Sequence, residues 1–253
     1  MSDPNCALAL IKLAWHSSGT GDQGGKLEGD GLRFKRALGG NAVLALTAMP
    51  WMDKIKEKVG PSISYPDLYT LGGVVAIECL GGPKIRWRAG RKDRGEERAA
   101  SEEEEEGRGL PESCVMSNDA DQLRCMFQHM RFEEGERDRA IVALSGAHAL
   151  GRLAEGEGAG GTATFNNAYF VLLSQMKKKR GGKREWDGPS EFETDTGDKI
   201  MLMPTDIALI NDPAFFKWVN VYAKDTDKFF SDFTVYFQQL TETGCKDLVE
   251  VAV

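Results

Sequence analysis

The stretch "LIKLAWHSSGT", residues 10–20, decides which fold this chain adopts. It places Lys12, Trp15 and His16 within five residues of one another. In a helix, residues four positions apart lie one above the other, so Lys12 and His16 share a face. The chain contains only three histidines. Taken alone, the stretch fits either a catalytic pair or a helix of the core that carries a histidine.

Composition limits the class of protein. A chain of 253 residues is long enough for one large domain or two lobes with a sizeable core. A formal net charge of −7 argues against a general nucleic-acid-binding surface. The five scattered cysteines argue against a disulfide framework or a structural zinc site, and they favour an intracellular, reducing compartment. No apolar run reaches the length of a transmembrane span, and no signal peptide is visible, although a targeting or anchoring segment could have been removed.

The pattern of apolar residues predicts a mostly α-helical architecture with minor β elements. Helices are expected at 6–18, 41–60 (disturbed at Pro50), 64–82 (capped by Ser64), 119–132 (with a break at Gly135), 137–153 and 166–176, and as three helices within 204–244. The breaks between the last three are expected at Asp212–Pro213 and Asp225–Thr226. Residues 177–203 suggest a basic turn with a β element. Residues 83–113 predict an exposed loop, in which the run Glu102–Glu106 is solvated.

The histidines have both plain and functional interpretations. His129 lies in a polar helix and is expected at the surface. His16 and His148 both lie in apolar helices beside small residues, as core histidines often do. Two such histidines in an α-helical chain also fit a flat cofactor held between two helices. Haem is the natural candidate, with one imidazole on the iron and the other on the open face.

Several long motifs carry a resemblance to a known family. "IKLAWHSSGT" (11–20) and "IVALSGAHALG" (141–151) resemble the distal and proximal segments of class I haem peroxidases, the group of ascorbate peroxidase and cytochrome c peroxidase. Further matching segments lie in order along the chain, at 64–93, 110–113 and 202–233. The resemblance implies a two-lobed helical fold with haem b between the lobes, residues 1–132 forming the distal half and 133–253 the proximal half.

The resemblance also assigns roles to residues. His148 matches the ligand of the haem iron, and Asp206 matches the carboxylate that accepts the Nδ1–H of that ligand. His16 matches the distal base that moves a proton on bound hydrogen peroxide. Trp15 matches the tryptophan packed over the haem, and Asn41 matches the asparagine that orients the distal histidine.

Departures from the family pattern imply altered chemistry. Lys12 stands where the family has arginine, which implies weakened compound I formation because lysine offers a point charge in place of a planar fork. The family has a tryptophan beneath the haem in the segment after the proximal histidine, which cytochrome c peroxidase needs for electron entry. No tryptophan follows His148 before residue 165, so oxidation of cytochrome c is expected to be poor. Ala149 follows the histidine without the threonine associated with a cation site, so potassium or calcium is not expected. Glu157 and Pro4 stand where ascorbate would meet arginine and lysine, which implies poor ascorbate oxidation.

Two functions stay open at this stage. The first is a haem peroxidase of low or altered activity that uses an unidentified small-molecule reductant. The second is a pseudoperoxidase whose sixth haem ligand comes from the chain itself, acting as a haem sensor or a scavenger of another oxidant such as peroxynitrite. Candidates for that ligand are a cysteine, a methionine near "TAMPWM" (47–52) and His16. The organelle and the oligomeric state also stay open.

Overall fold

The structure is a computed structural model, and it describes residues 4–19, 43–93, 119–148, 150, 164–175, 190–193, 199–202 and 204–251. The helices in these ranges are α1 (Pro4–Gly19), α2 (Val43–Val59), the short 3₁₀ helix η3 (Gly60–Ser62), α3 (Tyr65–Cys79), α6 (Asp119–His129), α7 (Glu134–Ser145), α9 (Ala168–Gln175), α10 (Pro204–Asn211), α11 (Pro213–Lys224) and α12 (Thr226–Glu242). The strands are β1 (Arg88–Ala89), β2 (Ser190–Glu193), β3 (Lys199–Leu202) and β4 (Val249–Glu250). The mostly α-helical prediction is confirmed.

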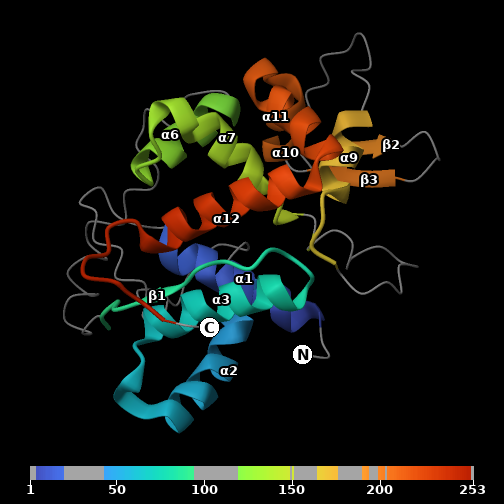
Figure 1. The fold of residues 1–253 in the computed structure, drawn as a ribbon. Helices are drawn as coiled ribbons and strands as arrows, with labels where there is room; N and C mark the ends of the chain where they lie inside the picture. Colours follow the sequence, from blue (N-terminus) through green and yellow to red (C-terminus); the bar gives the residue numbers. More distant parts are fainter. Residues whose placement is uncertain are drawn as a thin grey trace.

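The helices form two groups with α12 between them. Figure 1 shows α1, α2 and α3 below α12, and α6, α7, α10 and α11 above it. Helix α12 contacts both α1 and α7, so it joins the two groups. The division into halves at residue 132 remains a prediction, and contacts cross that boundary because α6 packs against α7 and α10.

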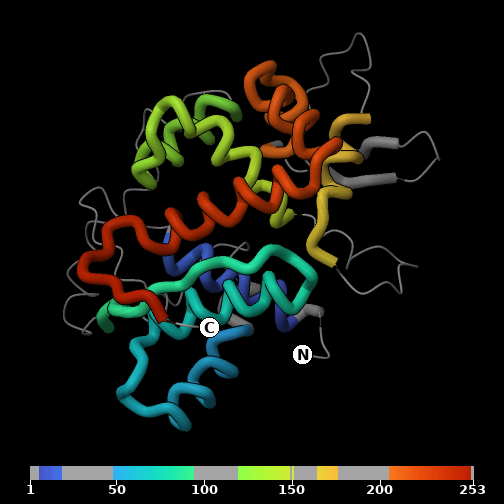
Figure 2. Tube along the Cα trace, viewed as in Figure 1, coloured from blue at the N-terminus to red at the C-terminus, as the bar shows by residue number. Residues whose placement is uncertain are grey.

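The segment after α12 also joins the two groups. Figure 2 shows the segment after α12 returning toward the lower group, where β4 pairs antiparallel with β1. The register joins Arg88 with Glu250 and Ala89 with Val249. Strands β2 and β3 form a separate antiparallel pair, as the β element expected near residues 177–203 predicts.

Helices α1 and α3 of the lower group pack closely, because small residues line their contact. A Cβ added at Gly73 of α3 would lie only 2.4 Å from the Cβ of Ala14. Glycine at this position therefore allows the two helices to touch. Leu13, Ala14 and Ala9 of α1 are fully buried as a result.

An aromatic cluster packs the segment before α9 against α12. Phe229 and Phe233 are one turn apart on α12 and fully buried, as expected for residues on one helix face. Both rings pack against Phe165, with centroids 5.5 Å and 4.8 Å away, respectively. Burying large aromatic rings supplies most of the apolar area of a core, so this cluster holds the segment before α9 against α12.

Local capping confirms the expected helix starts. The Ser64 hydroxyl accepts a hydrogen bond from the backbone N–H of Asp67, which caps α3. Asp212 and Asp225 cap α11 and α12 through their side chains, so both expected breaks are confirmed. Pro50 lies inside α2 and does not end it, since the helix runs from Val43 to Val59.

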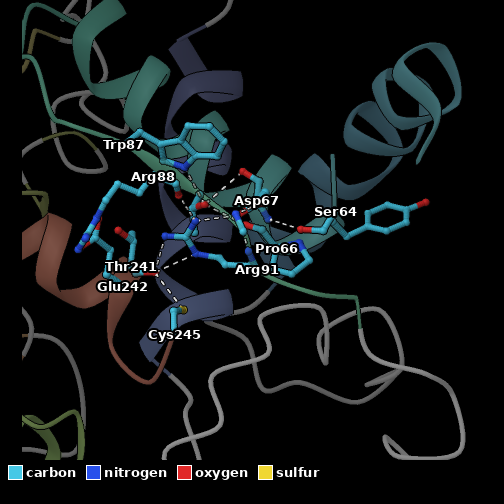
Figure 3. A network of polar contacts seen from close by, with 12 residues as sticks. Ser64, Pro66, Asp67, Trp87, Arg88, Arg91, Thr241, Glu242 and Cys245 are labelled. Carbon is cyan, nitrogen blue, oxygen red and sulfur yellow. Dashed lines mark hydrogen bonds and ion pairs between the residues drawn. The ribbon is translucent and has the colours of Figure 1, made fainter. Parts of the chain in front are cut away.

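The loop expected to be exposed at 83–113 is described only as far as residue 93, and there Ile85, Trp87 and Arg91 are buried between exposed or half-buried neighbours. Trp87 is only 5% exposed and Arg91 only 7% exposed. Figure 3 shows Arg91 between Asp67, at the start of α3, and Thr241, near the end of α12. Its guanidinium donates to Asp67 Oδ1 at 2.8 Å and to the Thr241 carbonyl at 2.8 and 3.0 Å. The expectation was wrong for these three buried residues, and Arg91 is buried because its guanidinium finds partners far away in the sequence.

Other local expectations were corrected. The break expected at Gly135 lies earlier, because α7 already begins at Glu134 and the turn before it contains Arg131 at a φ of 63°. His129 is half-buried, not a surface residue, and its Nδ1 lies 2.7 Å from the carbonyl oxygen of Cys125. Cys125 is disulfide-bonded, which the scattered cysteines of the sequence did not predict. None of the described helices has the length and apolarity needed to cross a membrane.

Candidate active site

The three site residues predicted on α1 form one half-exposed stripe. From Ala7 to Ser18, every residue of α1 is buried except Lys12, Trp15 and His16. Their spacing of three and four residues places them on one face. Between Ala7 and Ser18, the helix therefore opens to its surroundings only along this stripe.

The stripe lies toward the upper group of helices. The Trp15 ring packs against Phe127 of α6, with ring centroids 6.4 Å apart. Phe127 in turn packs on Phe132, at 5.0 Å. These contacts place the α1 stripe at the junction of the two helix groups, as expected for residues that line a site between lobes.

On the upper side, a buried carboxylate holds His148. Its Nδ1 lies 3.1 Å from Oδ1 of Asp206, which is fully buried near the start of α10. An ionised carboxylate can only accept, so the Nδ1 carries the proton and donates it to Asp206. In the neutral imidazole the Nε2 then has a free lone pair, and the His148 side chain is 35% exposed. The pair predicted between His148 and Asp206 is present in the structure.

The small residues before His148 have a packing role. A Cβ added at Gly146 would lie 2.6 Å from two ring atoms of Phe229. The close neighbour of this segment is the buried Phe229 ring of α12. The close approach fixes the backbone two residues ahead of His148.

Sequence reasoning missed Tyr169. Its hydroxyl donates to Asp206 Oδ1 at 2.5 Å, and its ring meets the His148 ring edge-on at 6.2 Å. Nothing in "FNNAYF" (165–170) shows that this ring rather than Phe170 points at the carboxylate. Only the packing of α9 against α10 and α11 reveals it.

Other predicted positions cannot be placed. Asn41, Ala149 and Glu157 lie outside the described residues. Pro4 begins α1, but its side chain is not described. The orienting role of Asn41 and the expectations about ascorbate and bound cations therefore remain predictions.

These features together define a class. The chain is mostly α-helical. It carries a histidine held by a carboxylate on the upper side and a Lys–Trp–His stripe on α1 of the lower group, and this is the helical fold of the peroxidases. The chain belongs to the peroxidase family, whose model matches residues 1–225. The resemblance found in the motifs is thereby confirmed at the level of the family.

Individual relatives agree with this placement. The chain is 41% identical to a mitochondrial cytochrome c peroxidase of Cryptococcus neoformans, over 96% of its own length and 63% of the relative. It is 39% identical to a protein of Pyricularia oryzae named "Putative heme-binding peroxidase", over 96% of its own length and 81% of that relative. It is 40% identical to a mitochondrial cytochrome c peroxidase of Emericella nidulans, over 93% of its own length. The chain thus spans less than two thirds of the cytochrome c peroxidases that it resembles.

Proposed function

We propose that this chain is a haem-dependent peroxidase-type oxidoreductase that acts on hydrogen peroxide or a related peroxide, with His148 as the ligand of the iron. The observation that carries the proposal is the hydrogen bond from His148 to the buried Asp206. Relatives named cytochrome c peroxidase and heme-binding peroxidase support haem as the cofactor and a peroxide as the substrate.

The residues on the upper side fit a haem iron. Iron binding needs a neutral imidazole whose free nitrogen points outward, and the Asp206 carboxylate selects that tautomer. His148 is partly exposed, although the segment before it, 140–144, is fully buried. Haem bound there would supply the redox chemistry, while the carboxylate increases the electron donation from the imidazole and so favours ferric iron.

The α1 stripe would bind and activate the peroxide. One ring nitrogen of His16 accepts a proton from the bound peroxide and returns it to the oxygen that leaves. Lys12 lies one helical turn away and supplies positive charge near that oxygen. Trp15, held by Phe127, covers the site on the same face.

Lys12 is the reason to propose weakened activity. An ammonium is a strongly hydrated point charge, whereas an arginine would offer a planar fork of several donors. Removing a preorganised donor to a developing oxyanion costs on the order of 2.7–4 kcal/mol in other enzymes. We therefore expect slow O–O cleavage, with a small-molecule reductant and poor oxidation of ascorbate or cytochrome c. An organelle as the location belongs to the same proposal, and two relatives with "mitochondrial" in their names support it.

The pseudoperoxidase alternative requires a ligand from the chain on the open face of the haem. Of the methionines near "TAMPWM", Met52 is buried, and its Cε lies 3.4 Å from where a Cβ at Gly72 would stand. Met52 therefore packs on α3. Met49, Cys6 and His16 are half-buried and remain candidates.

The resting ferric spectrum after titration with haemin separates the two functions. A five-coordinate, high-spin spectrum that changes on mixing with equimolar hydrogen peroxide supports the peroxidase. A six-coordinate, low-spin spectrum with slow response to peroxide supports the pseudoperoxidase. Failure to bind haemin with defined stoichiometry contradicts both.

A further inference from the structure

Asp206 receives hydrogen bonds from two side chains at the same oxygen. His148 Nδ1 lies 3.1 Å from Oδ1, and the Tyr169 hydroxyl lies 2.5 Å from it. The tyrosine contact is the shorter, in the range typical of a hydroxyl that donates to a charged carboxylate. Tyr169 is 4% exposed and Asp206 is fully buried, so both contacts are shielded from water.

The start of α9 holds Tyr169 in place. Asn167, directly before the helix, donates to the carbonyl oxygens of Tyr222 and Ala223 at 2.9 and 3.2 Å. These carbonyls belong to the last turn of α11, where backbone acceptors lack partners within the helix. The backbone two residues before Tyr169 is therefore fixed on α11, and the phenol ring packs against Phe170 with centroids 5.2 Å apart.

Two donors on one carboxylate oxygen compete for its electron density. The Tyr169 hydroxyl draws negative charge toward itself, which makes Oδ1 a weaker acceptor for the His148 Nδ1–H. A weaker pull on that proton leaves the imidazole with less anionic character. Its other nitrogen then donates less strongly to a bound metal ion.

We propose that Tyr169 is a positioning residue that tunes the iron ligand through Asp206, weakening the ligand's electron donation and raising the reduction potential of the haem. This inference rests on the proposed function, because it takes His148 as the ligand. It concerns the strength of the ligand and assigns no step of the reaction to the tyrosine.

The structure offers a matched control for the loss of one buried phenol. The Tyr222 hydroxyl donates to Asp232 Oδ2 at 2.9 Å, and Tyr222 and Asp232 are both buried. Among the described residues, Asp232 pairs with Arg139 and Lys228 and accepts the hydrogen bond from Tyr222. Tyr222→Phe therefore removes the same group from the same kind of partner without touching the pair that holds the ligand.

The test compares the ferric–ferrous potential and the iron–histidine stretching frequency of the haemin-loaded wild type, Tyr169→Phe and Tyr222→Phe. Tyr169→Phe should shift the equilibrium about tenfold toward ferric iron, which for one electron is a fall of about 59 mV. The stretching frequency should rise, and Tyr222→Phe should change neither value. Site-specific replacement of Tyr169 by 3-fluorotyrosine, a stronger donor, should raise the potential and serves if Tyr169→Phe fails to fold.

The outcomes separate this inference from the proposed function. A wild type without an iron–histidine band contradicts the proposed function itself. If the wild type has the band, three results overturn the role of Tyr169 alone. The ferric–ferrous equilibrium of Tyr169→Phe shifts by less than twofold, it shifts in the opposite direction, or Tyr222→Phe shifts it equally. A larger fall confined to Tyr169→Phe supports it.

Discussion

Replacing Arg91 by methionine tests how the two helix groups are joined. Arg91 links the first turn of α3 to the last turn of α12, because it donates both to Asp67 and to the Thr241 carbonyl. The side chains of Arg91 and Asp67 are only 3% and 6% exposed. Methionine keeps a comparable apolar stem but removes the charge and every donor of the guanidinium.

The expected cost follows from what the substitution leaves behind. The buried Asp67 side chain would keep the hydrogen bonds from the backbone N–H groups of Gly90 and residue 91, at 2.8 and 3.2 Å, but it would lose its charged partner. The Thr241 carbonyl would lose two donors at a helix end, where carbonyls lack partners within the helix. Removing one partner of a buried ion pair typically costs about 3–5 kcal/mol, a large share of the roughly 5–15 kcal/mol that stabilises a folded domain.

Arg88→Met is the matched control. Arg88 pairs with Glu242 in the same region, but the Arg88 side chain is 42% exposed. Glu242 is 11% exposed and keeps the hydrogen bond from Gln238 Nε2, so the loss of Arg88 should cost only about 1 kcal/mol. Urea unfolding of the haemin-loaded protein, followed by circular dichroism, measures the free energy of unfolding of both variants. The dependence of that free energy on urea concentration should be unchanged. The double variant Asp67→Asn/Arg91→Met should cost less than the sum of its single variants. An Arg91→Met cost as small as that of Arg88→Met would refute the reasoning.

Two further predictions concern the peroxide site and acid stability. Lys12→Arg should speed the reaction of the haemin-loaded protein with hydrogen peroxide by about 10-fold or more, because arginine supplies a planar fork of donors. Stopped-flow mixing measures this rate, and an unchanged rate would show that another feature limits the site. Burial alone raises the pKa of Asp232, but hydrogen bonds from Arg139, Lys228 and Tyr222 outweigh it and hold that pKa below its ordinary value. The resulting stabilisation is complete above a pH of about 3.9 and is lost as the pH falls through the lowered pKa. Urea midpoints measured from about pH 5 to 2 should therefore fall less steeply for Asp232→Asn than for the wild type. An equally steep fall in the variant would contradict this.

Local chemistry made much of the fold predictable from sequence. Ser64, Asp212 and Asp225 are helix caps, and capping depends only on residues within the same turn. The motifs around His16 and His148 were equally readable, since each is continuous in sequence. The His148–Asp206 pair followed from the resemblance, although its members are far apart along the chain.

Contacts between distant segments were not predictable in the same way. Arg91 looks like part of a charged loop until Asp67 and Thr241 surround it. Tyr169 and Phe170 are neighbouring aromatics, and only the packing of α9 decides which one reaches the carboxylate. Such choices depend on the tertiary arrangement, which a local pattern does not encode.

The ligand of the iron is the central claim, and His148→Gly tests it most directly. The haemin-loaded wild type should show an iron–histidine stretching band in its ferrous form. His148→Gly should lose that band, and added imidazole should restore haem binding through the space left by the side chain. A variant that keeps the band and the wild-type spectrum without imidazole would contradict the account.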